Sequence, residues 1–250
     1  MPVRLELLDR IGVVTIDAPE TRNALDRESA QELLDCLSEI GEDTSIRAAV
    51  IRGGGGTFCS GANRALLAEA AKNPYDEEVS IALETIYSSF VALCELPVPT
   101  IAALRGAAVG AGANLALAAD VRIASDQARI VSGFLRIGLH PGGGHFTLLE
   151  RLAGPQTTAA MTLLGQEVRG ERLRELGLAW EVLPDEEVED RAIALASLLS
   201  DARLARDAVS TFRAQSWARQ VPMATAVRSE QAAQFASLAR RPEAPQTTSD

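Results

Sequence analysis

Lysine is nearly missing from this sequence of 250 residues, and Lys72 is its only example. Lysine and arginine together number 24 against 34 aspartate and glutamate residues, which gives a formal net charge of −10. This balance argues against nucleic acid or an anionic membrane surface as a partner, because both are bound through clustered cations. A Walker-type phosphate loop needs lysine directly after glycine, but Ala71 precedes Lys72. We expect Lys72 to be an exposed helix end rather than a Schiff-base lysine.

Cysteine is also scarce, and long apolar runs are absent. Cys36, Cys59 and Cys94 are odd in number and form no C-x-x-C pair, which argues against a disulfide framework and favours a reducing compartment. The first residues lack the apolar stretch of a signal peptide, and no run approaches the ~18 apolar residues of a membrane span. These absences predict a cytoplasmic protein that neither enters nor spans a membrane.

Alternating helices, apolar strands and glycine loops predict an α/β layout. Residues 3–8 and 11–16 form a predicted β-hairpin. A helix capped by Asp26 and ending at Gly41 comes next, followed by a buried strand over 48–51. Further along, we expect helices at 78–94, after Gly112 and at 146–152, strands at 100–104, 121–124, 129–131 and 179–183, and a nearly all-helical stretch over 186–239 that only Pro222 interrupts.

Two glycine-rich segments, 56–62 and 106–112, each follow a strand and open a helix. Backbone N–H groups at such junctions, assisted by the helix dipole, favour an oxyanion. Two amides from different loops aimed at one point form an oxyanion hole. The alternative is simple close packing of strand on helix. A dinucleotide site is disfavoured because Leu115 stands where the third glycine of that fingerprint belongs.

Five segments occur in a characteristic order: Glu-Thr-Arg-Asn-Ala-Leu (20–25), Thr-Phe-Cys-Ser-Gly-Ala-Asn (57–63), 99–106 with Gly110-Ala-Gly112, Asp-Val-Arg-Ile-Ala (120–124) and Gly-Leu-His-Pro-Gly-Gly-Gly (138–144). Together they resemble the crotonase (enoyl-CoA hydratase/isomerase) superfamily over about residues 3–185. The resemblance implies a crotonase/Clp-protease-like α/β spiral of ββα units with an acyl-CoA-binding core over 1–195 and a C-terminal helical trimerisation region over 196–250. We expect a homotrimer or a dimer of trimers, with helices around 195–199 and 235–238 supplying the interface. Residues 241–250 have nothing to bury, so we expect them to be disordered.

The resemblance also implies a set of site residues. The backbone amides of Ser60 and Ala111 correspond to the pair that holds the thioester oxygen. Neither residue is proline, so both N–H groups are available. Coenzyme A is expected as part of the substrate, with no further cofactor and no metal. The implied substrate-binding positions are Arg22, Ala24, Ala62, Asn63, Arg64, Gly110, Phe134 and Gly138.

Two departures from the family affect the expected reaction. Asn114 and Phe134 occupy the positions of the two glutamates that family hydratases use to activate water and protonate the α-carbon. Asparagine orients water but accepts no proton near neutral pH, and phenylalanine does neither. Histidine is the commonest general base, and His140 is the best available acid/base in the loop after Gly138. For both histidines a structural role is favoured over chemistry: His140 packs under the loop, and His145 caps or lines the start of the helix.

Three functions stay open from the sequence. The first is a lyase- or isomerase-like acyl-CoA enzyme that stabilises a thioester enolate, with Asn114 orienting water or substrate. The second is a catalytically silent acyl-CoA carrier that kept the oxyanion grip and lost its glutamates. The third is an acyl-CoA hydrolase.

Overall fold

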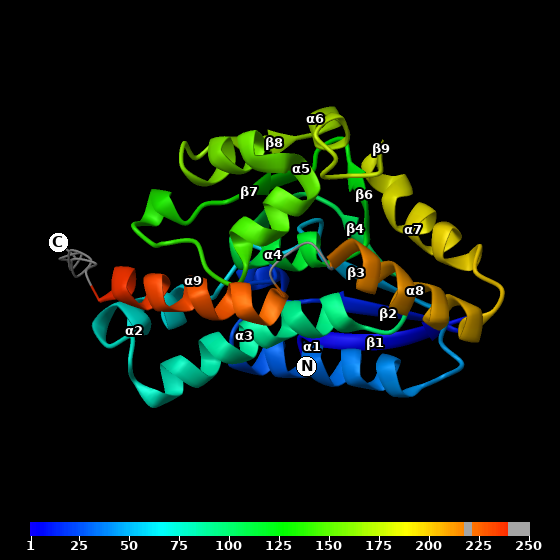
Figure 1. The fold of residues 1–250 in the computed structure, drawn as a ribbon, viewed down its shortest axis with the longest axis horizontal. Helices are drawn as coiled ribbons and strands as arrows, with labels where there is room; N and C mark the ends of the chain where they lie inside the picture. Colours follow the sequence, from blue (N-terminus) through cyan, green and yellow to red (C-terminus); the bar gives the residue numbers. More distant parts are fainter. Residues whose placement is uncertain (218–221, 240–250) are drawn as a thin grey trace.

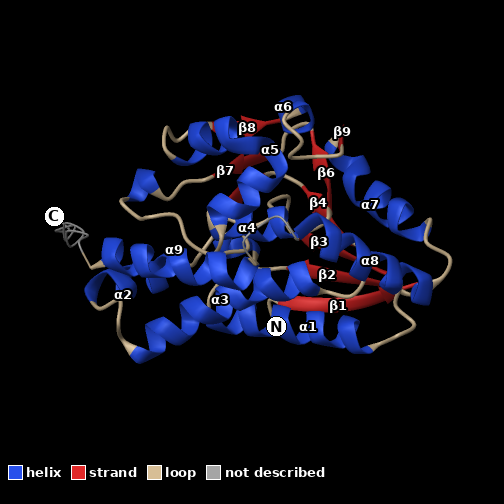
Figure 2. Cartoon of the chain, in the orientation of Figure 1, coloured by secondary structure: helices blue, strands red, loops and turns tan. Residues whose placement is uncertain are grey.

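A computed structural model describes residues 1–217 and 222–239. In that part of the chain the strands form two sheets, with helices packed around them (Figures 1 and 2). The larger sheet has the order β1-β2-β3-β4-β6-β9, antiparallel at β1–β2 and parallel at every other pair; the smaller has the order β5-β7-β8. The strands are β1 (Val3–Leu8), β2 (Ile11–Ile16), β3 (Ala48–Gly53), β4 (Thr100–Leu104), β5 (Ala107–Val109), β6 (Val121–Ser125), β7 (Arg129–Val131), β8 (Glu167–Arg169) and β9 (Glu181–Leu183).

The predicted N-terminal hairpin is confirmed. β1 pairs antiparallel with β2 from Val3 opposite Ile16 to Leu8 opposite Ile11. The two turn residues, Asp9 and Arg10, have φ values of 45° and 63°. A two-residue hairpin turn with positive φ at both positions matches the right-handed twist of the flanking strands.

The first helix, α1 (Arg27–Glu42), begins as the sequence predicts. The Asp26 carboxylate accepts the Ser29 N–H at 3.0 Å, and the Ser29 hydroxyl accepts the Asp26 N–H at 2.9 Å, which together form a capping box. The predicted end at Gly41 is wrong by one residue. The helix passes through Gly41 to Glu42, and the extended Asp43 follows it.

Helices cover both faces of the larger sheet, so its central strands are almost entirely buried. On one face α1 packs against α3 (Glu77–Glu95), and α3 packs against α4 (Ala111–Ala118). On the other face α7 (Val188–Ser197) lies against β3, β4 and β6. Every residue of β4 is buried, as expected for a parallel sheet covered on both sides.

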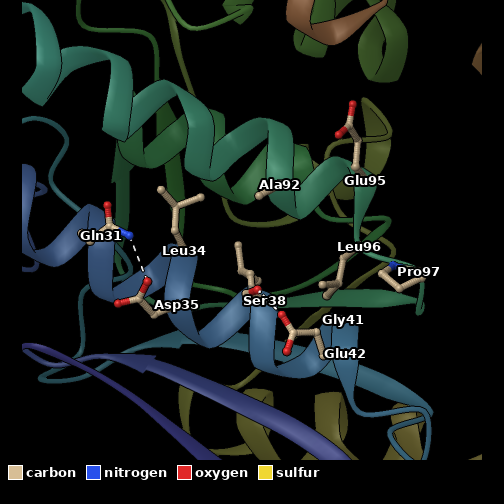
Figure 3. A pocket seen from close by; sticks show the side chains of 11 residues that line it. Gln31, Leu34, Asp35, Ser38, Gly41, Glu42, Ala92, Glu95, Leu96 and Pro97 are labelled. Carbon is tan, nitrogen blue, oxygen red and sulfur yellow. Dashed lines mark hydrogen bonds between the residues drawn. The ribbon is translucent and has the colours of Figure 1, made fainter.

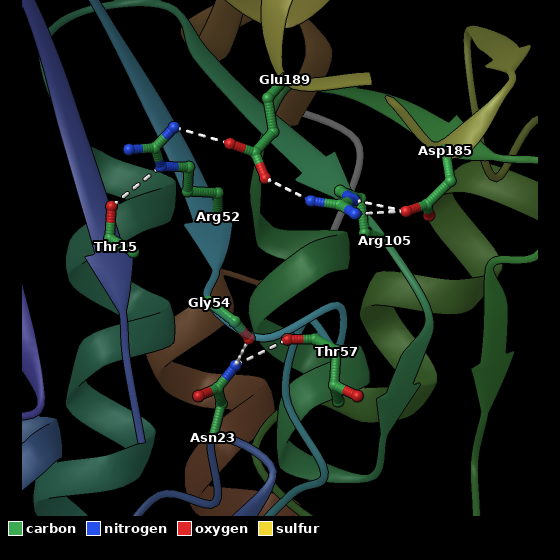
Figure 4. A network of polar contacts seen from close by, with 8 residues as sticks. All are labelled: Thr15, Asn23, Arg52, Gly54, Thr57, Arg105, Asp185 and Glu189. Atoms are coloured by element: carbon green, nitrogen blue, oxygen red, sulfur yellow. Dashed lines mark hydrogen bonds and ion pairs between the residues drawn. The ribbon is translucent and has the colours of Figure 1, made fainter. Parts of the chain in front are cut away.

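Ion pairs hold α7 to the ends of β3 and β4 (Figure 4). Arg52 donates to Thr15 at 2.9 Å and to Glu189 at 2.7 Å. Arg105 reaches the other oxygen of Glu189 at 3.0 Å, and its Nε donates to Asp185 at 2.8 Å. Glu189 thus bridges two neighbouring strands of the sheet.

The sequence predictions missed some short elements. Helix α5 (His145–Thr162) consists of two helical stretches that meet at Gly154, whose φ of 74° and ψ of 173° are not helical. The predicted helix over 146–152 is the first of these stretches, and the second was not predicted. Lys72, as predicted, is exposed in the last turn of its helix, α2 (Arg64–Lys72). The elements that were not predicted are β5, β8, α6 (Glu171–Glu175) and the short 3-10 turns η1 (Pro19–Thr21), η2 (Leu135–Ile137) and η3 (Asp185–Glu187).

The C-terminal helices correct part of the predicted interface. The predicted boundary at residue 195 falls inside α7, and α8 (Ala202–Trp217) and α9 (Met223–Leu238) follow. Phe235 and Leu238, expected at an interface between chains, are 8% and 1% exposed within their own chain. The reason is that α9 packs on α2, α3 and α5 of the same chain (Figure 1). The trimer stays a prediction, and residues 241–250 lie outside the described residues.

Candidate active site

The two glycine-rich loops predicted from the sequence lie against each other. The Cys59 N–H donates to Ala107 O at 3.1 Å, and Cys59 O accepts the Val109 N–H at 3.0 Å. A Cβ added to Gly112 would lie 2.2 Å from Cys59 O, so only glycine permits this approach. Burial raises the pKa of the Cys59 thiol to about 12, which leaves this cysteine as a packed core residue.

Ser60 was predicted to supply one amide of an oxyanion hole, but its N–H is already used. It donates to Arg22 O at 3.0 Å, and the Ser60 hydroxyl donates to Thr21 O at 2.9 Å. The physical reason is that the chain around residues 21–25 runs beside this loop and saturates the Ser60 backbone. The assignment of Ser60 is therefore corrected.

Two other amides, those of Ala62 and Ala111, have the required freedom. The Leu25 N–H donates to Gly61 O and the Asn63 N–H to Leu25 O, each at 2.7 Å, so the intervening Ala62 N–H faces away from that segment. The Ala111 N–H opens α4 and has no acceptor one turn earlier. Across residues 1–217 and 222–239, neither N–H has a hydrogen-bond acceptor.

The two free amides come from adjoining segments. A Cβ added to Gly61 would lie 3.8 Å from Ala111 N and 2.7 Å from Val109 O. Gly110, the N-cap of α4, has φ 54° and ψ −112°, a conformation that turns the chain sharply into the helix. Donors from two rigid loops, one of them at a helix N-terminus, are the arrangement that stabilises an oxyanion.

Phe134 lies directly beside this turn. Its ring end is 3.7 Å from the position of a Cβ on Gly110, and its side chain is almost fully buried. Phe134 begins the tight turn that Gly138 closes with φ 70°. The site therefore presents an apolar ring beside Gly110 and has no acid/base side chain at this position.

Asn114 was expected to orient water or substrate, but both ends of its amide bind protein atoms. Its Nδ2 donates to Gly142 O at 2.8 Å, and its Oδ1 accepts from His145 Nδ1 at 2.6 Å. Asn114 is 1% exposed. Its role in this structure is to join α4 to the loop before α5.

The two histidines differ sharply in environment. His140 is half-buried, its Nδ1 donates to Pro141 O at 2.6 Å, and the ring therefore keeps Nε2 as a proton acceptor. His145 is fully buried at the start of α5, and burial lowers its pKa to about 3. The His145 ring packs edge-on to Phe134 with centroids 4.9 Å apart.

Glu230 is a residue of the site that sequence reasoning missed. Its carboxylate oxygens accept the N–H groups of His145 at 2.7 Å and Phe146 at 3.2 Å, so it caps α5 from α9. Burial raises its pKa to about 7 against the opposing effect of these bonds. The signal in the sequence was a carboxylate four residues before Gln234 and three after Val227, both buried on the same helix face.

Asn23 anchors the first glycine-rich loop by side-chain hydrogen bonds to its backbone (Figure 4). Its Nδ2 donates to Gly54 O at 2.9 Å and to Thr57 O at 2.6 Å, and its Oδ1 accepts the Ala18 N–H at 2.8 Å. The side chain is completely buried. Asn23 thereby links the segment whose Arg22 O accepts the Ser60 N–H to the loop that contains Ser60.

The other predicted substrate-binding residues lie around this centre. Arg22 and Arg64 are exposed, and Ala24 is half-buried. Asn63 caps α2, because its Oδ1 accepts the Ala65 N–H at 2.9 Å. A groove of about 360 Å³ reaches Asn63 between the starts of α2 and α3.

A larger groove of about 590 Å³ runs between α1 and α3 (Figure 3). Asp35, Glu42 and Glu95 line it, and none of the predicted site residues does. Carboxylates repel the phosphates of a nucleotide, so this groove does not suit coenzyme A.

Two further searches concern the described residues only. None of their helices combines the length and the apolar character needed to cross a bilayer. No group of three or more His, Cys, Asp or Glu side chains among them is arranged to hold a metal ion.

Known proteins match this geometry and sequence. The family model for enoyl-CoA hydratase/isomerase matches residues 7–246. The chain belongs to the enoyl-CoA hydratase/isomerase family. A "Probable enoyl-CoA hydratase" of Mycobacterium tuberculosis is 39% identical over 184 residues, covering 74% of this chain and 70% of that protein. The 1,2-epoxyphenylacetyl-CoA isomerase of Escherichia coli is 35% identical, covering 76% and 72% respectively.

Solved structures of this family have the same fold. An enoyl-CoA hydratase from Bacillus anthracis superposes with a TM-score of 0.80 at 26% identity, covering 93% of this chain and 89% of that one. An enoyl-CoA hydratase from Mycobacterium avium subsp. paratuberculosis gives a TM-score of 0.82, also at 26% identity, covering 97% and 92%. The crotonase fold predicted from the sequence is confirmed.

Proposed function

We propose that this member of the enoyl-CoA hydratase/isomerase family binds an acyl-CoA thioester and stabilises negative charge on the thioester oxygen. The observation that carries this proposal is the pair of unpaired amides, Ala62 N–H and Ala111 N–H, presented by two adjoining loops. Such donors cost no reorganisation during reaction, and they act best where water is excluded. The named activities of the relatives, which concern CoA thioesters, agree with this assignment.

An enolate is the charged species that this site suits, in a lyase- or isomerase-like reaction. The two-glutamate route is missing, because Asn114 and Phe134 hold those positions and each general acid–base role contributes typically ~10²–10⁴ in rate. His140 is the proposed acid/base, since its Nδ1–H is bound to Pro141 O and its Nε2 is left to accept a proton. Coenzyme A enters as part of the substrate.

A catalytically silent acyl-CoA carrier is the second candidate. The closed network around Asn114 favours it, because that side chain is saturated by Gly142 and His145 and offers no proton-accepting group. Under this proposal the Ala62 and Ala111 amides contribute to acyl-CoA affinity, and the protein catalyses no reaction. A cytoplasmic location and a trimer or dimer of trimers accompany both candidates as predictions.

Exchange of α-hydrogens in D₂O, read by mass for a panel of acyl-CoAs, tests the first candidate. Deuterium uptake is expected, and Ala111→Pro should lower it by about 10²–10³ because one donor is lost. Proline is well tolerated at the first residue of a helix, so this variant should keep α4 while its Cδ replaces the N–H hydrogen at the oxyanion position. Ala111→Gly keeps the N–H and serves as the matched control. An Ala111→Pro protein that exchanges at the original rate contradicts the oxyanion assignment.

His140→Gln separates the two candidates. It should abolish exchange while leaving acyl-CoA affinity unchanged if His140 is the acid/base. Acyl-CoA binding without exchange in the unmodified protein favours the silent carrier. Unchanged exchange in His140→Gln removes His140 from the mechanism.

A further inference from the structure

Three buried polar side chains next to the proposed oxyanion hole form one hydrogen-bonded chain. Ser132 Oγ lies 2.9 Å from His145 Nε2, and His145 Nδ1 lies 2.6 Å from Asn114 Oδ1. The residues come from three places, the end of β7, the start of α5 and the middle of α4. Their exposed fractions are 2%, 0% and 1%. Neither the family resemblance nor the proposed function uses Ser132.

The hydrogen bonds fix the direction of every proton in this chain. Asn114 Nδ2 donates to Gly142 O, so the acceptor Oδ1 must face the histidine. An amide oxygen only accepts, so His145 Nδ1 carries the proton and Nε2 is left to accept the Ser132 hydroxyl proton. A serine whose hydroxyl donates to an imidazole that a third group orients is an activated nucleophile. The imidazole tautomer required for that chemistry is thus set by Gly142 O.

Ser132 also adjoins the oxyanion loops. The Gly110 N–H donates to Val131 O at 2.9 Å, and Ser132 O lies 3.7 Å from the position of a Cβ on Gly110. Ala111, whose N–H is one of the free donors, is the next residue. The segment that ends in Ser132 is therefore hydrogen-bonded to the segment that leads into Ala111 and α4.

We propose that Ser132, His145 and Asn114 form a nucleophilic triad that hydrolyses the bound acyl-CoA thioester. This second reaction rests on the proposed function, because it uses the same oxyanion hole. Ser132 Oγ attacks the thioester carbon as its proton passes to His145 Nε2, and the oxyanion forms against the Ala62 and Ala111 amides. The carbonyl re-forms, the C–S bond breaks, and the sulfur takes the proton from His145. Water then loses a proton to His145 and attacks the acyl-serine, which releases the carboxylic acid and returns the proton to Ser132.

Two features of the surroundings bear on this chemistry. The Phe134 ring packs edge-on against His145 and is itself 8% exposed, so it lies between His145 and the surface on this side. The lowered pKa of His145 keeps its imidazole neutral across ordinary pH.

The test incubates the full chain with acetyl-, butyryl-, octanoyl- and phenylacetyl-CoA. Free CoA is measured with a thiol reagent, and the intact protein and its peptides are weighed after an acid quench. We expect CoA release and an added acyl mass on the peptide that contains Ser132. Ser132→Ala should abolish both, and Ser132→Cys should keep the adduct, because a thiol is also a nucleophile. Ser89→Ala is the matched control, since Ser89 is also fully buried but its hydroxyl only bonds Ile86 O in α3.

Binding of the same acyl-CoAs, followed by calorimetry, separates the two proposals. Binding without CoA release overturns the triad and leaves the proposed function standing. CoA release that survives in Ser132→Ala also overturns the triad. Absence of binding by all four thioesters and by CoA itself overturns the proposed function, and the triad with it.

Discussion

Two buried titratable groups at the start of α5 should change stability with pH in opposite directions. Burial raises the pKa of Glu230 from its usual 4.5 to about 7 and lowers that of His145 from its usual 6.5 to about 3. Between 4.5 and 7 the folded protein holds the Glu230 proton more tightly than the unfolded chain does, so stability falls as pH rises. Between 3 and 6.5 the unfolded chain protonates His145 more readily, so stability rises with pH.

The two effects overlap from about pH 4.5 to 6.5 and should nearly cancel there. A shift of one pKa unit corresponds to about 1.36 kcal/mol of stability. Because each group is only half titrated at one end of this window, its contribution to the free energy of unfolding changes by about 2 kcal/mol across it. Glu230→Gln removes the falling contribution, so its stability relative to the unmodified protein should rise by about 2 kcal/mol across the window. His145→Gln removes the rising contribution, and its relative stability should fall by a similar amount.

Urea unfolding at half-unit steps of pH measures both effects. Each substitution also breaks hydrogen bonds, but that cost is the same at every pH and shifts a curve without tilting it. Ser237→Ala is the control from the same helix face, because its hydroxyl accepts the His140 N–H at 2.9 Å and does not titrate. Its curve should lie below that of the unmodified protein and parallel to it. A Glu230→Gln curve that is also parallel would refute the account of burial at this helix end.

Two further substitutions test the loops that carry the oxyanion donors. Gly112→Ala should lower the melting temperature severely or prevent folding, because the new Cβ would stand 2.2 Å from Cys59 O. Gly56→Ala is the control, because a Cβ there has no atom within 4 Å. It should lower the free energy of unfolding by only about 1–2 kcal/mol, the cost of alanine at a φ of 73°. Asn23→Ala should lower the free energy of unfolding by about 2–3 kcal/mol, because Gly54 O, Thr57 O and the Ala18 N–H lose a buried partner, and urea unfolding measures the loss.

The fold was largely predictable because its signals are local or belong to the family. The Asp9-Arg10 turn and the Asp26 cap depend on neighbouring residues, and both are in the structure. The missed strands β5 and β8 have three residues each, too few for a clear alternation of apolar and polar positions. The predicted helix over 146–152 is the first part of α5, which is broken at the non-helical Gly154, and Pro155 lies at the start of the second part.

The site was less predictable because its decisive contacts join distant segments. Ser60 and Ala62 are two residues apart, and only the pairing with residues 22–25 decides which amide stays free. Glu230 lies 85 residues from the His145 amide that it caps. No spacing rule connects a carboxylate in a C-terminal helix to the start of a helix formed so much earlier in the chain.

The glycine run before α5 holds Asn114 and His145 in one packed unit. A Cβ on Gly143 would lie 2.8 Å from Asn114 Nδ2, and one on Gly142 would lie 2.4 Å from Gln234 Oε1. The run therefore lets the loop approach α4 and α9 closely, which brings Gly142 O and His145 to opposite ends of the Asn114 amide. An aspartate at 114 has the shape of asparagine and would set a carboxylate oxygen against Gly142 O with no donor between them. A glutamate is one methylene longer than the buried Asn114 and also offers Gly142 O no donor. Asn114→Glu should therefore lower the free energy of unfolding, measured with urea, because Asn114, His145 and the glycines form one packed unit.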